Sequence, residues 1–320
     1  MSRPRALARW ALRAAISAGV VSYILVDVDH HDLWGALTAV RPRDLVLPLG
    51  VYLAGQVLSA VKWWMLGTSV GLARPLREYV RFYFIGMFLN VFGLSTIGGD
   101  VVRGLYLGDG RRPGLALNSV VFDRVSGLAI LMALGAAALL AFPQYNLPRV
   151  LSVACIVGGL TLVVGWWTCP RLVRLLPRGN RLRRQVEHDL APFWRDRRLL
   201  VSTSVLSLVF HLSQVVVQWL LARAAGTSLP FSYCLVMHPM LSLMMALPLS
   251  IGGFGVREGG YLYFLTTIDV DDSIAVTMGL LWWLMTALSG LVGAGVFLAS
   301  GATLPRLRAR PASERVRGAA

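Results

Sequence analysis

The sequence has few cysteines, few acidic residues and none of several common catalytic motifs. Its three cysteines, Cys155, Cys169 and Cys234, are isolated, and no CxxC pair suggests a disulfide framework or a thiolate metal site. No Walker loop provides for ATP binding, and no HExxH sequence provides for a zinc hydrolase. We therefore expect no enzymatic activity, no cofactor, no metal site and no built-in ATP drive.

Acidic residues number 16 against 31 basic ones, which gives a formal net charge of +15. In a soluble protein this excess would suggest a nucleic-acid partner. Here the arginines lie between long apolar runs, where they report membrane topology and attraction to anionic lipid. The sequence therefore predicts a lipid environment and no nucleic-acid partner.

Apolar residues make up 56% of the chain, and the mean hydropathy is +0.63. Apolar runs of about 20 residues recur, which is the length that crosses a bilayer. The arginine-rich N-terminus precedes such a run without a small-residue cleavage site, so we expect a retained first span. Full spans are predicted near residues 11–28, 45–67, 115–142, 149–167, 199–222 and 273–299.

Two further apolar stretches, 79–107 and 231–268, are broken at their centres by glycines. Arginines flank 79–107 on both sides, and because basic loops stay in the cytoplasm, this stretch should enter and leave on that side. The flanks of 231–268 are weakly charged or acidic, so this stretch should enter from the outside. The predicted fold class is an all-α membrane protein, a helical bundle of about six full spans plus two inverted re-entrant helical hairpins.

The whole chain, 1–320, is expected to form one integral membrane domain. Its parts are a first half over 1–167, a basic cytoplasmic linker over 168–198, a second half over 199–303 and a basic tail over 304–320. The linker is interpreted as a solvated connector that touches anionic lipid.

One seven-residue pattern, Ile-Gly-Gly-x-x-Val-Arg, lies at the centre of each broken stretch. Its copies are Ile97–Arg103 and Ile251–Arg257. Paired glycine-interrupted segments in the two halves of a chain point to the binding site of a transporter. The alternative is two glycine-rich turns that are similar by coincidence.

Four charges of the first half are predicted to share one depth in the membrane. From the helical rise, Asp100 lies about 10 Å from its cytoplasmic helix end, and Asp123 and Arg124 lie about 12–14 Å from theirs. Asp100 and Arg103 are three residues apart and can pair, whereas Asp123 and Arg124 are adjacent and need other partners. Two interpretations stay open. The four charges either form ion pairs that only fix the hairpin in the bundle, or the arginines also bind a phosphate.

The second half carries its own polar residues at membrane depth. Arg257 and Glu258 are adjacent, so Arg257 is expected to face a central cavity and Glu258 another element. A polar stripe runs along one helix face with spacings of three and four, and its His211, Gln214 and Gln218 are one candidate contact for Glu258. The members of the stripe are Ser204, Ser207, His211, Gln214 and Gln218. The stripe is expected either to line a cavity or to bond neighbouring helices together.

The stretches LSTIGGDVVRGLYL, VVFDRVSGLAIL and ALPLSIGGFGVREGGYLYFL resemble the flippase-like transmembrane family. This family includes the membrane half of lysylphosphatidylglycerol synthases, which couples lipid aminoacylation to lipid flipping. Its elements match Gly99, Asp100 and Arg103, then Asp123 and Arg124, then Gly252, Gly253, Gly255, Arg257 and Glu258. Asp123 stands where glutamate is usual. The resemblance covers nearly the whole chain, but no soluble synthase domain follows, so only the lipid-handling role is implied.

We therefore expect a stand-alone lipid transporter or flippase-like protein that binds and translocates an anionic phospho- or isoprenoid-type lipid. Some stand-alone relatives are associated with hopanoid or isoprenoid-lipid pathways. Its head-group contacts are expected from Gly98, Gly99, Asp100, Arg103, Asp123, Arg124, Gly252, Gly253, Arg257 and Glu258. One alternative is a non-transporting subunit that presents lipid to a separate lipid-modifying enzyme, and another is a small-solute carrier. The expected location is a bacterial inner membrane, with both termini in the cytoplasm.

Overall fold

A computed structural model of the chain describes residues 22, 28–92, 98–108, 112–145, 149–177, 179–180, 183, 187, 191–246, 253 and 255–301. Within these residues every regular element is a helix. In chain order the elements are α2 (His30–Ala39), η1 (Pro42–Leu45), α3 (Val46–Ser69), α4 (Leu76–Phe92), α5 (Gly98–Gly108), α6 (Pro113–Ala141), η2 (Pro143–Tyr145), α7 (Arg149–Leu172), η3 (Val173–Leu175), α9 (Ala191–Arg195), α10 (Arg197–Ala224), α11 (Phe231–Ala246), α12 (Val256–Thr266) and α13 (Asp272–Ala299).

Four helical segments are long and apolar enough to cross a bilayer. They are η1 with α3, α6, α10 and α13, each of 28 or 29 residues. At 1.5 Å per residue such a helix is about 42 Å long, more than the roughly 30 Å of a hydrocarbon core. Four of the predicted full spans coincide with these segments, and the predicted span 149–167 lies within α7. The predicted first span, 11–28, lies almost entirely outside the described residues.

Helix α7 presents an apolar face to its surroundings. Its exposed side chains recur every three or four residues, at Val150, Val153, Val157, Leu160 and Val164. A stripe of this length on a helix exposes a large apolar patch, which a hydrocarbon environment accommodates and water does not.

Polar caps set where two of the long helices begin. The Asp196 carboxylate accepts from the backbone N–H groups of Arg198 and Leu199 at the start of α10, at 2.9 and 3.2 Å. Asp271 accepts in the same way from the Ser273 N–H at the start of α13, at 2.9 Å. The hydrogen bonds from the Ser273 hydroxyl and backbone N–H lower the pKa of the Asp271 carboxyl below its usual value.

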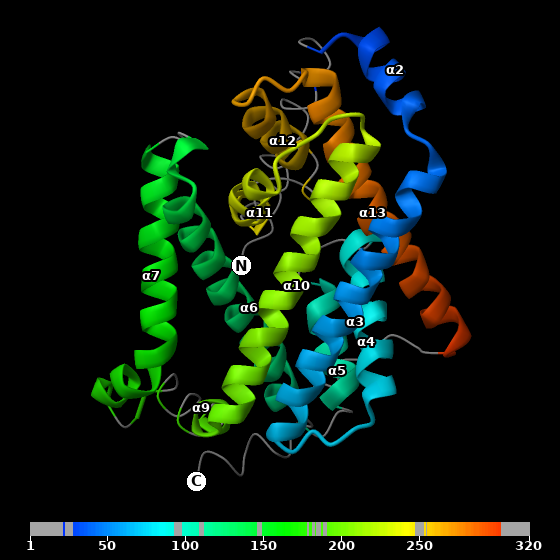
Figure 1. The fold of residues 1–320 in the computed structure, drawn as a ribbon. Coiled ribbons are helices and arrows are strands. Elements are labelled where there is room, and N and C mark those ends of the chain that lie inside the picture. The colour runs from blue at the N-terminus through cyan, green and yellow to red at the C-terminus, as the bar shows by residue number, and fades with distance from the viewer. Residues whose placement is uncertain are drawn as a thin grey trace, which may run out of the picture.

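The two glycine-broken stretches each form an antiparallel helical hairpin. In the first, Phe82 of α4 stacks on Tyr106 of α5 with ring centroids 5.2 Å apart, so the chain runs back alongside itself. In the second, the Tyr233 hydroxyl of α11 donates to the Phe264 carbonyl of α12 and lies 3.0 Å from the Thr267 hydroxyl. In Figure 1, α4 and α5 lie toward the lower end of the long helices, and α11 and α12 toward the upper end.

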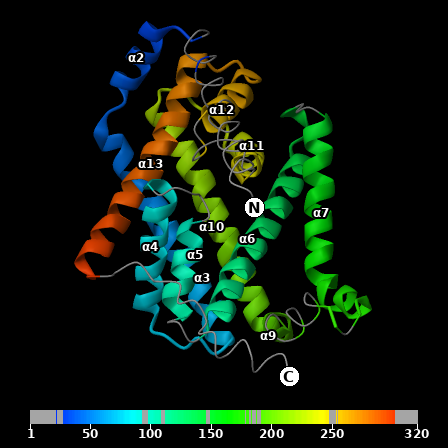
Figure 2. The ribbon, with the colours of Figure 1, turned by 180° about the vertical axis from the view of Figure 1, so that it is seen from behind.

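The hairpins pack on the long helices through glycines. The Cα atoms of Gly290 and Gly293 on α13 face α4, where an added side chain would meet Val91, Phe92 and the backbone of Phe84. The absence of side chains lets α4 and α13 approach closely. On the other side of the molecule α6 and α7 contact each other; in both views they lie close at the upper end and diverge toward the lower end (Figures 1 and 2).

The linker prediction was wrong in one respect, because part of this segment is buried. Phe193 of α9 is 1% exposed and stacks on Phe122 of α6 with ring centroids 4.1 Å apart. Trp194 meets the same ring edge-on at 5.1 Å. The arginines on both sides of α9 had suggested a solvated connector. The aromatic pair between them instead anchors the segment to the bundle.

Candidate functional site

The first glycine motif holds the start of α5 against α4. The Gly99 N–H donates to the Asn90 side-chain oxygen at 2.8 Å, which satisfies one of the free donors at the helix N-terminus. A side chain at position 99 would collide with the carbonyl oxygen of Gly86. This close approach places Asp100 and Arg103, on the first turns of α5, inside the bundle.

Arg103 is enclosed on all sides by protein. Its side chain is 1% exposed, and its guanidinium lies over the rings of Trp63 and Tyr83, at 4.7 and 4.9 Å from the ring centroids. It forms ion pairs of 3.1 Å with Asp100 and 3.0 Å with Asp123. The predicted pairing of Arg103 with Asp100 is therefore present, and a second acid from α6 completes it.

Asp123 has a second cationic partner that the sequence analysis missed. Lys62 Nζ, on α3, lies 3.1 Å from the Asp123 carboxylate and donates to the Asp123 backbone carbonyl at 2.8 Å. Both side chains are at most 5% exposed. A signal was present in the sequence, because Lys62 is its only lysine and lies within an apolar run.

Arg124 points away from its neighbour Asp123, as adjacent helical positions do. Its Nε and Nη2 atoms donate to the two carboxylate oxygens of Asp100 at 2.9 and 2.8 Å, a bidentate pair. The third nitrogen, Nη1, has no protein partner among the described residues. The Arg124 side chain is 55% exposed, in contrast to the enclosed side chain of Arg103.

The five side chains form one alternating chain of charges, which we call the charge cluster. In order they are Lys62, Asp123, Arg103, Asp100 and Arg124. Each acid lies between two cations, which offsets the cost of its burial. With Lys62 counted as protonated, three cations face two acids, and the cluster carries one excess formal positive charge. The predicted clustering of Asp100, Arg103, Asp123 and Arg124 is thus present, with Lys62 as a fifth member.

Two neighbouring cavities that share part of their lining adjoin the charge cluster, each with a volume of about 290 Å³. The lysine chamber is lined by Ser59, Lys62, Asp123, Gly127, Leu128 and Ser207. The histidine chamber is lined by Tyr52, Gln56, Met87, Asn90, Val91, Gln214, His238, Trp282, Thr286 and Ser289. Both are lined by Tyr83, Arg124, Leu131, Phe210, His211 and Ser242. Arg124 therefore lies on the part of the wall that both chambers share.

The polar stripe of α10 faces the interior, as predicted, except that Ser204 at its start is only partly buried and lines neither chamber. Ser207, His211, Gln214 and Gln218 are all buried, and the first three line the chambers. Gln218 instead donates its amide N–H to the hydroxyl of Tyr261 on α12, at 3.1 Å. The stripe therefore both lines a cavity and joins two helices.

The prediction for the second motif was wrong, because Arg257 and Glu258 pair with each other. Arg257 Nε and Nη2 donate to one Glu258 oxygen at 3.0 and 2.7 Å, and the Gly255 N–H donates to the other at 2.8 Å. Glu258 thus closes the N-terminus of its own helix rather than contacting the stripe. Long side chains on a first helical turn can fold back along the chain, which the rule about adjacent positions overlooks.

The backbone before this pair has the left-handed conformation that glycine adopts without strain. The φ angles of Gly253 and Gly255 are +81° and +83°. Gly252 lies outside the described residues. Neither Arg257 nor Glu258 lines the two chambers, and no described residue of the first motif lines them either. The charged residues that do are Lys62, Asp123 and Arg124, on α3 and α6.

Residues 67–71, Gly-Thr-Ser-Val-Gly, match the GxSxG spacing of hydrolase nucleophiles. That motif requires a serine on a sharp turn between a strand and a helix. Here Ser69 is the last residue of α3, and its hydroxyl donates to the Leu66 carbonyl at 2.8 Å. The spacing therefore carries no argument for hydrolysis.

A bundle of long apolar helices with a charged cluster and a polar cavity inside defines a multi-pass membrane protein. The chain belongs to the lysylphosphatidylglycerol synthase TM region family, whose sequence model matches residues 10–294. The family predicted from the sequence motifs is thus confirmed, and the match includes every member of the charge cluster. No curated protein matches the chain.

Proposed function

We propose that this protein binds the phosphate of an anionic membrane lipid at Arg124 and translocates the lipid between the two leaflets. The observation that carries the proposal is the excess positive charge of the cluster, together with the half-exposed Arg124 between two chambers. Arg124 Nη1 is a donor without a protein partner among the described residues. A phosphate oxygen would accept from it while Asp100 holds the rest of the guanidinium in place.

The helical hairpins support a translocation role. Helices α4 and α5 have 17 and 11 residues, and α11 and α12 have 16 and 11. At 1.5 Å per residue they are roughly 17–26 Å long, each shorter than a hydrocarbon core of about 30 Å. We infer that both hairpins are re-entrant, that they enter from opposite faces, and that six full spans surround them.

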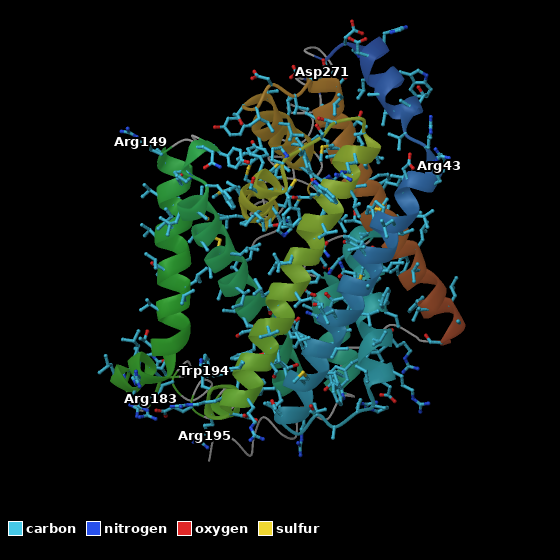
Figure 3. All side chains as sticks on the ribbon, in the orientation of Figure 1. Arg43, Arg149, Arg183, Trp194, Arg195 and Asp271 are labelled. Carbon is cyan, nitrogen blue, oxygen red and sulfur yellow. The ribbon has the colours of Figure 1, made fainter. Side chains whose placement is uncertain are left out.

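The distribution of charged residues supports an orientation. Arg183 and Arg195 lie at the lower end of the bundle in Figure 3, and Asp271 lies at the upper end, where Arg43 and Arg149 are also labelled. Following the rule for basic loops, we assign the lower end to the cytoplasm of a bacterial inner membrane. We also expect both termini, which lie outside the described residues, to be cytoplasmic. In this proposal the protein is not an enzyme and acts on its lipid without covalent chemistry.

The completeness of the ion pairs favours one second candidate. Every charge of the cluster has a partner of opposite sign, which also suits a protein that holds lipid for a separate lipid-modifying enzyme. The two functions differ in one measurable respect. A presenting subunit binds the lipid through Arg124 and does not move it across the bilayer.

The test uses the full chain in phosphatidylcholine vesicles that contain a trace of fluorescent phosphatidylglycerol. Bleaching by external dithionite should destroy more than the outer-leaflet half of the label. Arg124→Gln should slow this transfer and weaken lipid binding about tenfold to a hundredfold, the range for one charge-assisted hydrogen bond. Lipid binding and transfer in Arg124→Lys should lie between those of the wild type and Arg124→Gln, because lysine keeps the positive charge but cannot form a bidentate pair.

The matched control is Arg223→Gln, which removes an exposed arginine that lies on α10 over the ring of Trp219. It should leave binding and transfer unchanged. Arg124-dependent binding without transfer would favour the presenting subunit. Unchanged binding in Arg124→Gln would refute the head-group site.

A further inference from the structure

We propose that the histidine chamber selects a lipid whose phosphate carries an uncharged, hydroxyl-bearing group such as a polyol or a sugar. The inference rests on the proposed function, because it places the phosphate at Arg124. It adds a chemical class for the part of the head group beyond the phosphate.

The first observation is a set of buried ring nitrogens without partners. His238 is 3% exposed, and neither Nδ1 nor Nε2 has a hydrogen-bond partner. The Nε2 atom of His211 lies 3.0 Å from the Gly127 carbonyl oxygen, which can only accept, so this nitrogen donates. The His211 Nδ1 atom is then an acceptor, and it too has no partner.

These two rings lie close together on the wall of one chamber. Their centroids are 5.9 Å apart, and both residues line the histidine chamber. A neutral imidazole offers one donor and one acceptor, and leaving such atoms unpaired in a buried site is unfavourable. A hydroxyl group donates and accepts at once, so it can satisfy either ring nitrogen.

The second observation is the charge of the wall. Arg124 is the only charged residue among the described residues that line the histidine chamber, and none is a carboxylate. Amide and hydroxyl groups supply the rest of the polar wall, among them Gln56, Asn90 and Gln214. An ammonium group would meet no counter-ion here and would be repelled by Arg124. The chamber therefore suits a neutral hydroxylated group and not an aminoacyl or ethanolamine group.

The test compares two lipids with the same acyl chains and the same phosphodiester charge. Phosphatidylinositol carries a polyol, and phosphatidylmethanol carries only a methyl group. Binding to the purified full chain is measured by native mass spectrometry. Phosphatidylinositol should bind about tenfold more tightly, as expected for one or two additional hydrogen bonds.

Substitutions of His238 test whether the preference for phosphatidylinositol arises in the histidine chamber. His238→Phe keeps a planar ring without nitrogens, and it should lower phosphatidylinositol binding to the level of phosphatidylmethanol while leaving the latter unchanged. His238→Gln keeps a donor and an acceptor and should retain part of the preference. The matched control is Thr277→Val, which removes another buried, unpartnered polar atom that does not line the chamber.

The outcomes separate this inference from the proposed function. Equal binding of both lipids, with loss of both in Arg124→Gln, would overturn the inference and leave the lipid site intact. Tighter binding of an amine-bearing lipid would also overturn it. Absence of any Arg124-dependent lipid binding would refute the proposed function itself.

A competition experiment adds excess inositol 1-phosphate, a soluble compound, to the protein with bound phosphatidylinositol. Competition at the affinity of the lipid would support the polyol-phosphate chemistry and assign it to a soluble solute instead. If His238→Phe fails to fold, the wild-type ratio and His238→Gln still decide the inference.

Discussion

At the scale of single residues, Lys62 gives the charge cluster its sign. Without it two cations would face two acids, and the site would carry no net charge to attract a phosphate. Asp123 would keep Arg103 as a partner at 3.0 Å, so it would not be stranded. The role of Lys62 can therefore be separated from the folding of the bundle.

We expect Lys62→Met to weaken the binding of anionic lipid about tenfold, because the net charge falls to zero. Its unfolding free energy should drop by less than the roughly 3–5 kcal/mol of a fully unpaired buried charge. Native mass spectrometry and thermal unfolding in detergent measure the two effects. Lys62→Arg is the control that keeps the charge. Full lipid affinity in Lys62→Met would show that the excess charge does not attract the ligand.

A second prediction concerns the exchange of charges within α5. The double variant Asp100→Arg with Arg103→Asp keeps the composition of the cluster but places a carboxylate beside Asp123 and between two aromatic faces. Both contacts repel a negative charge. We expect this variant to melt at a lower temperature than Arg103→Ala. A native melting temperature would mean that the ring contacts of Arg103 contribute nothing.

The sequence predicted four of the five charges in the cluster, because helical spacing alone brings Asp100 and Arg103 together and turns Arg124 away from Asp123. It did not yield the ring contacts of Arg103, since Trp63 and Tyr83 come from two other helices. It also did not yield the unpartnered nitrogens of His238. Such features depend on how helices pack, which one-dimensional spacing does not contain.

At the scale of elements, the two copies of the motif are alike in sequence and different in contacts. The fourth position is Asp100 in the first copy and Phe254 in the second, and the residue after the arginine is Gly104 or Glu258. The first arginine therefore binds acids on its own helix and on α6, and the second pairs with its immediate neighbour. The repeat predicted two hairpins, and the positions that vary determine which hairpin carries the cluster.

Glycine at position 99 is predicted to set the contact between α4 and α5. In Gly99→Ala the new methyl group would meet the Gly86 carbonyl oxygen, and backbone cannot move aside as a side chain does. We expect a loss of about 1–3 kcal/mol, the usual effect of overpacking, and weaker lipid binding because Asp100 and Arg103 shift. Thermal unfolding and lipid binding in the same detergent measure both.

The matched control for this variant is Gly50→Ala on α3, where nothing lies within 4 Å of the added methyl group. It should be neutral or stabilising by up to about 1 kcal/mol, because alanine favours a helix more than glycine does. Equal effects of both substitutions would show that the approach of Gly99 to Gly86 is not a tight contact.

At the scale of the whole molecule, the two hairpins and the charged loops predict one topology. The first hairpin returns to the end from which it starts, so both of its flanking loops should face the cytoplasm, while the loop after the second hairpin should face outward. In a chain with Cys155, Cys169 and Cys234 replaced by serine, single cysteines at Gly110 and His188 should react with an impermeant maleimide only from the cytoplasmic side. A cysteine at Asp271 should react only from the outside.

Labelling of position 110 from the outside would mean that α4 and α5 belong to a segment that crosses the membrane and do not form a re-entrant hairpin. The inverted arrangement would then be lost, and with it the support that the two hairpins give to a translocation role.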